Sequence, residues 1–551
     1  MGVVTHKTDI TIIQQKENVT MKKRILAIFL ASVMAVGMVA GCGKSDEKTT
    51  GTKEETAKEG EDEGEKIEGG SIVRAMPSDI SSLNIIYETG DEGATMLQAV
   101  YDPLYVVSKD EVRYYLAESR TISDDGLKIT VKLRDNLKWH DGESITADDV
   151  LWNFEFRMNP ENKASSGTKV NQKPVTIEKI DDLTFAVTVP EVSASYDAYL
   201  GGMKLLPKHV YEGEANIASS TLNTTQGVGS GPYKVKEWKK GESLTLEKFD
   251  DYYREVNLDT VVFKIMPNES AQEIAFENGE TNIIRVSTID KFEKYASNDK
   301  YEMVTLDEGR INYMGFNSNS ELMKNIEARK AIATALDVEA IVDGAYGSKD
   351  IAVPAKTVFC SQNFYYKDVE GYKHNAEEAK KLVKEAGLEG KTLKLVYNSS
   401  RPNMEDCALI IQQQLKEYGI NVEVTGYETQ GFFEKFFYTD LGDWDLGLNG
   451  YVANGDNQGN EFMFSNQGFL SKNLCSTDEI ADLFNEGDAT FDSKERARIY
   501  GEIQEKIKEC YTMVPISDCK FIFAVDKHIK GCDEINIVPI FEDYTKLYMT
   551  K

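Results

Sequence analysis

The chain has 551 residues, of which 41% are hydrophobic and 10% aromatic, and its formal net charge is −29 at pH 7. This composition is that of a globular protein, and the length allows several domains. The acidic balance excludes nucleic acid as an expected partner, because binding to phosphate needs a basic surface.

A secretory signal is the first informative segment. After Met21, the basic residues 22–24 precede an apolar run over residues 25–38, which is shorter than the roughly 20 residues of a membrane-spanning helix. Residues 39–41 read Val-Ala-Gly and precede Cys42, an order that resembles the lipobox of bacterial lipoproteins. We expect residues 1–41 to be an N-terminal extension and signal peptide. The resemblance implies that Cys42 is acylated and that the protein is anchored by its lipid on the extracytoplasmic face, at the cell surface or in the periplasm; an uncleaved N-terminal anchor is the alternative.

Residues 42–69 are predicted to be a disordered tether. This stretch is rich in Glu, Lys, Gly and Thr and has no aromatic residue, so it cannot bury enough surface to fold. As a flexible chain it would span about 30 Å, which places a folded body just off a membrane surface.

The most diagnostic stretch is 116–156. Asp125 and Gly126 indicate a tight turn, apolar residues alternate with polar ones over residues 129–133 as in a half-buried strand, and Thr146 stands three residues before Asp149 as in a helix-capping box. His140 begins a second turn, which runs to Gly142, and Trp139 precedes it. We interpret them as a packing indole and a turn residue rather than as catalytic or metal-binding groups, because no second ligand stands nearby.

Farther along the chain, residues 393–424 predict a strand, a helix and a strand, which is a βαβ unit with parallel strands. The helix has apolar residues on one stripe and ends at Gly419. Two more helices are predicted over residues 376–386, capped by Asn375, and over residues 494–508.

Three ordered motifs resemble those of the family 5 extracellular solute-binding proteins, the oligopeptide-, dipeptide- and nickel-binding lipoproteins of ABC importers. The resemblance covers the chain from about residue 70 to its end. The motifs are the run from Asp124 to Val150, the GSGPY-x-x-x-x-W sequence at residues 229–238, and the pair YMGFN at 313–317 with ARKAIATALD at 328–337.

The resemblance implies an α/β, two-lobed, periplasmic-binding-protein-like fold with an extra subdomain in the first lobe. Its expected boundaries are residues 70–100 and 215–300 for lobe one, 101–214 for the family-specific subdomain, 301–515 for lobe two, and 516–551 for a return to lobe one.

The resemblance also implies a ligand enclosed between the lobes. Peptide-binding relatives carry a Gly-Trp-x-Ala-Asp element whose Asp neutralises the peptide's amino group; here residues 450–454 read Gly-Tyr-Val-Ala-Asn. Tyr451 keeps an aromatic wall, Asn454 lacks the charge, and Asp456 is the nearby carboxylate that could replace it. The expected ligand-binding residues are Phe432, Tyr451, Asn454, Asp456, Tyr313 and Asn317.

The predicted function is therefore that of a lipid-anchored, monomeric receptor that delivers a peptide-like ligand to ABC permease subunits. It is not expected to be an enzyme or to need a cofactor or resident metal, since the H-E-x-x-H and G-x-S-x-G signatures are missing and the five histidines are scattered. The same fold with an oligosaccharide or metal-chelate ligand stays open as an alternative, with a surface hydrolase as a weaker one. Cys360, Cys407, Cys475, Cys510, Cys519 and Cys532 are left open between free thiols and disulfides.

Overall fold

The computed structural model describes residues 64–551 except residues 89, 110, 165–166, 402, 439–442, 454, 467, 469–472 and 536–542, and except the side chain of Asp91. The predicted signal, the lipidation site Cys42 and all but the last residues of the tether lie outside the described residues, as does Asn454. None of the described helices has both the length and the hydrophobicity of a membrane-spanning segment.

A large sheet runs through the molecule in the order β11-β12-β13-β2-β14-β20-β15-β19-β17-β18, with β16 (Ala352–Pro354) paired to β20. We call lobe one the part around β11 (Tyr233–Lys239), β12 (Ser243–Lys248), β13 (Thr260–Ile265), β2 (Ser71–Met76) and β14 (Ile283–Val286). Lobe two is the part around β19 (Leu446–Val452), β17 (Thr392–Asn398) and β18 (Asn421–Tyr427).

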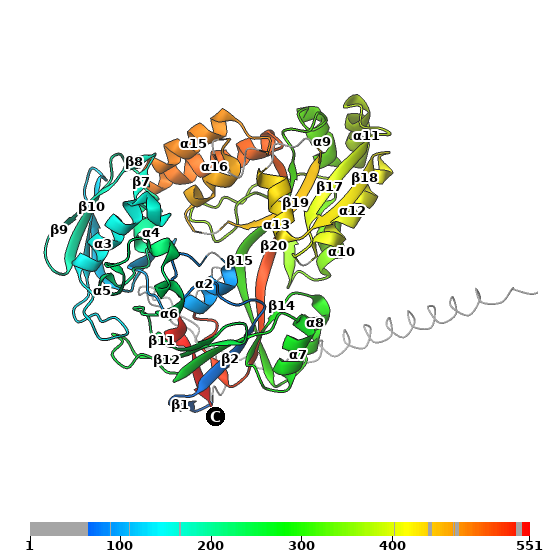
Figure 1. Cartoon of the computed structure of the whole chain (residues 1–551). Coiled ribbons are helices and arrows are strands. Elements are labelled where there is room, and N and C mark those ends of the chain that lie inside the picture. Colours follow the sequence, from blue (N-terminus) through cyan, green and yellow to red (C-terminus); the bar gives the residue numbers. More distant parts are fainter. Residues whose placement is uncertain are drawn as a thin grey trace, which may run out of the picture. The chain divides into compact units, whose positions relative to one another are not determined.

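Two long antiparallel strands, β15 (Tyr301–Phe316) and β20 (Met513–Asp526), belong to both lobes (Figure 1). Residues 522–525 of β20 pair with β14 of lobe one, whereas residues 310–316 of β15 pair with β19 of lobe two. The β15–β20 register shifts between Asp307 and Arg310, where Gly309 has φ +71°. This bulge therefore lies where the pair passes from one lobe to the other.

A smaller body, which we call the subdomain, has its own four-stranded sheet in the order β5-β6-β10-β9. Its core is made of side chains between Leu104 and Leu205, including Trp139 and Phe185, both with 0% exposure. Helix α3 (Ala147–Met158) packs on it, and its capping box is confirmed: Thr146 N donates to Asp149 Oδ2 at 3.0 Å and Asp148 N donates to Thr146 Oγ1 at 3.3 Å. The bounds of its other main elements are β5 (Ala117–Ile122), β6 (Lys128–Leu133), β9 (Thr176–Lys179), β10 (Thr184–Thr188) and α4 (Tyr196–Gly201).

Lobe two contains the predicted βαβ unit. Strands β17 and β18 are parallel and are joined through α12 (Met404–Glu417), which ends before Gly419 with φ +77°. The other two predicted helices are confirmed as α11 (Ala376–Glu385), capped by Asn375, and α16 (Ser493–Glu509). Further helices of this lobe are α9 (Ile326–Ala335), α10 (Val338–Tyr346) and α15 (Asp478–Asp488). All six cysteines of the described part are free thiols.

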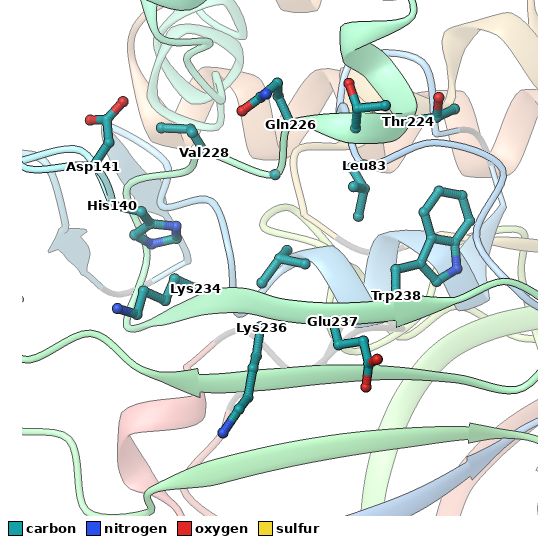
Figure 2. Close-up of a pocket in the computed structure, with 13 residues that line it drawn as sticks. Leu83, His140, Asp141, Thr224, Gln226, Val228, Lys234, Lys236, Glu237 and Trp238 are labelled. Atoms are coloured by element: carbon teal, nitrogen blue, oxygen red, sulfur yellow. The ribbon is translucent and has the colours of Figure 1, made fainter.

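The turn at His140 joins the subdomain to lobe one. The Nε2 of His140 lies 3.0 Å from Gly231 O, and Gly229 N donates to its Nδ1 at 3.1 Å, so both ring nitrogens are occupied by backbone groups. Figure 2 shows the ring beside a polar pocket of about 430 Å³, together with Lys234 and Trp238. The packing and turn roles that we inferred for Trp139 and His140 are thus confirmed.

Burial lowers the pKa of His140 to about 4. In the unfolded chain this ring has an ordinary pKa of 6.5. Between pH 6.5 and 4 it is therefore protonated in the unfolded state but stays neutral in the folded state. We predict that the free energy of unfolding falls by about 2–3 kcal/mol over this range, and that the variant His140→Gln lacks this part of the loss. Urea unfolding of both proteins at several pH values measures the difference; identical pH profiles would contradict it.

Candidate functional site

The subdomain and lobe two touch each other across a cavity of about 430 Å³. The carboxylate of Asp488, at the end of α15, accepts hydrogen bonds from Ser193 Oγ at 2.7 Å and from Ser195 N at 3.0 Å, and Ala194 N donates to the backbone oxygen of Asp488 at 2.8 Å. Figure 1 shows α15 and α16 facing the subdomain strands β7 (Lys169–Val170) and β8 (Lys173–Pro174). These contacts describe a closed arrangement of the two bodies.

We call this space the acidic cavity. Its walls are residues 167, 169–171, 193, 195–196 and 198–199 of the subdomain and residues 456, 458–459, 461 and 488 of lobe two. Three of its lining residues carry a carboxylate, namely Asp456, Glu461 and Asp488, and one, Lys169, carries an amine. A molecule held here would touch both bodies and would thereby favour their closure.

A second cavity of about 610 Å³, which we call the basic cavity, adjoins the first through Ala198 and Tyr199, because both residues line both spaces. Its walls come from residues 85–86, 157, 163–164, 198–199 and 202–204. Among the described residues that line it, the charged ones are Arg157, Lys163 and Lys204, and none is acidic. In the described part of the chain, the charged side chains that line the first cavity are therefore mostly acidic, and those that line the adjoining second cavity are basic.

A third cavity, of about 360 Å³, lies beside the bulge of β15 and has Ser400 of lobe two in its wall. The Glu308 side chain is 1% exposed and accepts a hydrogen bond from Arg310 Nε at 2.7 Å. The guanidinium of Arg285 lies 4.5 Å from the centre of the Phe521 ring and 3.5 Å from Glu308. This cavity is built from paired and stacked charges at the junction of the lobes.

Most of the ligand-binding residues predicted from the sequence lie in the core of lobe two. Tyr313, Phe432 and Asn317 each have 0% exposure and Tyr451 has 6%. The Tyr451 hydroxyl donates to Val358 O, and Asn317 Nδ2 donates to Trp444 O at 2.7 Å. In this structure these side chains contact other residues of lobe two, and their binding of a ligand stays a prediction. Asn454 lies outside the described residues.

Asp456 reaches the acidic cavity, but its charge is already neutralised. Its carboxylate accepts from Arg496 Nη1 at 2.9 Å and from Nη2 at 3.0 Å, and both side chains are more than nine-tenths buried. Tyr365 and Tyr500 also bond to Arg496, at 3.1 Å each. In this structure Asp456 is the ion-pair partner of Arg496, and a role of Asp456 toward a ligand's amino group stays a prediction.

Arg157, Tyr199 and Asp488 are cleft residues that the sequence reading missed. Arg157 could have been found, because it follows Val150 and Phe154 on the buried stripe of one helix, where a charged residue is unusual. Tyr199 and Asp488 give no such signal, since only the tertiary fold brings residues 193–199 to the end of α15.

The fold and this cleft define a two-lobed, periplasmic-binding-protein-like protein, in which a small molecule would be held between two bodies joined by crossing strands. Comparison with known proteins identifies the family. The model of the bacterial extracellular solute-binding proteins, family 5 (middle), matches residues 111–469, and the chain belongs to this family. The resemblance inferred from the sequence motifs is thereby confirmed.

Two solved structures and one characterised relative illustrate the similarity. The chain is 33% identical to the ABC transporter substrate binding protein CtaP from Listeria monocytogenes (TM-score 0.83, 88% of this chain and 100% of that one). It is 35% identical to a putative peptide binding protein AppA from Clostridium difficile (TM-score 0.79, 87% and 100%). It is 27% identical to the oligopeptide-binding protein AppA of Bacillus subtilis over 89% of this chain and 92% of that one, whose structure was solved with a nonapeptide (TM-score 0.74).

The Asp456–Arg496 pair gives a test of a structural against a ligand-binding role. We predict that Asp456→Ala lowers the free energy of unfolding by about 3–5 kcal/mol, because it leaves the Arg496 charge buried without its partner. The exposed pair Lys324–Glu321 serves as the control, and Glu321→Ala should leave the free energy of unfolding nearly unchanged. Urea unfolding measures both; a stable Asp456→Ala protein that has only lost ligand affinity would contradict the structural role.

Proposed function

We propose that this protein captures a peptide in the cleft between its two lobes and delivers it to the permease of an ABC importer. The observation that carries the proposal is a pair of adjoining cavities beside the subdomain: one is shared with lobe two and has mostly acidic charged residues, and the other is shared with lobe one and has basic ones. A peptide has an amino group at one end and a carboxylate at the other, so this polarity suits it better than it suits a neutral oligosaccharide. The peptide-binding descriptions of the relatives support the same class of ligand.

The protein performs no chemistry in this proposal, in line with its relatives, which are described as binding proteins. In the described part of the chain, no group of three or more His, Cys, Asp or Glu side chains is placed to hold a metal ion. The ligand would shift an equilibrium between separated and closed bodies by touching both, and the permease would meet the closed form.

Calorimetric titration tests the class of ligand. We predict that a pool of tripeptides binds and raises the melting temperature. The free energy of unfolding should rise by about 2.7 kcal/mol when the ligand is at 100 times its Kd. Maltotriose and a nickel–histidine complex are the comparison ligands for the two alternatives. Binding of either of these with no response to peptides would contradict the proposal.

We also propose that Cys42 anchors the protein to the outer face of the cytoplasmic membrane. The support is the sequence around it, with its basic start, short apolar run and Val-Ala-Gly before the cysteine. Members of the family are extracytoplasmic solute-binding proteins, which agrees with such a location.

The anchor is tested by expressing the full chain in a bacterium and separating membranes from soluble protein. We expect wild type in the membrane fraction with a lipid on its N-terminal peptide by mass spectrometry, and Cys42→Ala without that lipid. Cys510→Ala, which removes a thiol of the folded body, is the matched control and should behave as wild type. An unmodified Cys42 in membrane-bound wild type would refute the lipid anchor.

A further inference from the structure

A second contact joins the subdomain and lobe two outside the acidic cavity. Phe491 lies in the loop of residues 489–492, which connects α15 to α16. Its ring lies so close to Gly126, in the turn between β5 and β6, that a Cβ atom at position 126 would be 2.1 Å from the ring carbon Cε2. Gly126 is buried although residues 123–125 of the same turn are exposed. A side chain of lobe two thus packs directly against the backbone of the subdomain.

The loop that carries Phe491 is held in place by lobe two itself. Asp492 caps α16, and its side chain accepts a hydrogen bond from Glu495 N at 2.8 Å. At the other end of the loop, Thr490 Oγ1 donates to Glu486 O at 2.8 Å. The four residues 489–492 are therefore anchored to both helices, which keeps Phe491 at a fixed position on the surface of its lobe.

The turn that receives the ring is fixed in the subdomain in a similar way. Gly126 has φ +70° and donates from its N to Ser123 O at 2.8 Å. The next residue, Leu127, accepts at its backbone oxygen from Val189 N at 2.9 Å. This bond ties the turn to the chain that leads to residues 193–195, a second segment of the subdomain that contacts lobe two.

Phe491 is neither a core residue nor a cavity residue. It is 43% exposed and does not belong to the hydrophobic cores formed by the described residues. Neither Phe491 nor Gly126 lines any of the cavities described above. The contact removes apolar surface from water when the two bodies meet, and it thereby favours the closed arrangement.

We propose that the Phe491–Gly126 contact is a latch, which stabilises the closed arrangement and so determines how tightly ligands bind without touching them. When the empty protein is mostly open, the apparent affinity for every ligand is reduced by the fraction of molecules that are closed. A contact that raises this fraction strengthens the binding of all ligands by the same factor, whereas a residue in a cavity changes affinities selectively. The inference rests on the proposed function and adds to it a group that sets affinity but not specificity.

The test is calorimetric titration of the full-length folded protein with a pool of tripeptides and then with the two tripeptides of that pool that bind wild type most tightly. We expect Phe491→Ala to weaken the binding of both by the same factor, about 5- to 10-fold, the range for loss of a half-buried aromatic contact. Its free energy of unfolding without ligand should equal that of wild type, because the ring belongs to neither core. Leu409→Ala is the matched control, since Leu409 is 46% exposed on α12, and it should leave both affinities unchanged.

A double-mutant cycle with Gly126→Ala tests the other side of the latch. The added Cβ would displace the ring, so it should weaken binding in the wild-type background but not further in Phe491→Ala, where no ring remains. The φ of +70° makes this substitution costly for folding in both backgrounds. The cycle therefore compares the affinities of the folded proteins and not their stabilities.

The outcomes separate the latch from the proposed function. An unchanged affinity of Phe491→Ala for both tripeptides would overturn the latch while leaving peptide binding intact. A loss confined to one tripeptide would indicate direct contact with that ligand and would also overturn it. If wild type binds no member of the pool, the proposed function fails and this inference fails with it.

Discussion

The structure depends on two strands of the large sheet, β15 and β20, that belong to both lobes at once. Because β15 and β20 pair with lobe one at one end and with lobe two at the other, their hydrogen-bond ladder is the mechanical connection between the bodies. A continuous ladder resists bending, but the register shift around Gly309 interrupts it where the strands leave lobe one. Motion of the lobes is therefore expected at this bulge, where Glu308 is buried against Arg310.

The cleft follows from this connection. The crossing strands bring residues that are far apart in the chain, such as Ser193 and Asp488, to opposite sides of one narrow space. The contacts between the subdomain and lobe two are weak; among the described residues they include three hydrogen bonds to Asp488. A ligand that touches both bodies can therefore shift the equilibrium between their separated and closed arrangements. The Asp456–Arg496 pair, by contrast, is fixed within lobe two, and its role is to hold the wall of the acidic cavity in place.

The local structure could be predicted where the sequence of a short segment determines its conformation. The capping box at Thr146 and the βαβ unit around α12 are of this kind, because turn chemistry and apolar periodicity determine them within a few residues. The two-lobed fold was predicted from the resemblance of three sequence motifs to those of a known family.

The ligand-binding site was harder to predict from the sequence. Tyr313 and Phe432 are aromatic, as residues of a ligand-binding wall often are, yet both are buried in the core of lobe two. Aromatic residues satisfy a core and a binding site equally well, so sequence alone could not separate the two. Arg157 was visible as a charge on an apolar stripe, but its cavity is formed by segments distant in sequence, which the sequence does not place together.

The central claim, that two bodies hinged on β15 and β20 close over a peptide, is tested most directly by small-angle X-ray scattering of the ligand-stripped protein with and without a tripeptide pool. The account predicts a larger radius of gyration for the empty protein and a decrease when peptide is added. It predicts a further increase for empty Asp488→Ala, which lacks the side-chain contact between the bodies. A radius that stays the same in all three samples would contradict the hinge.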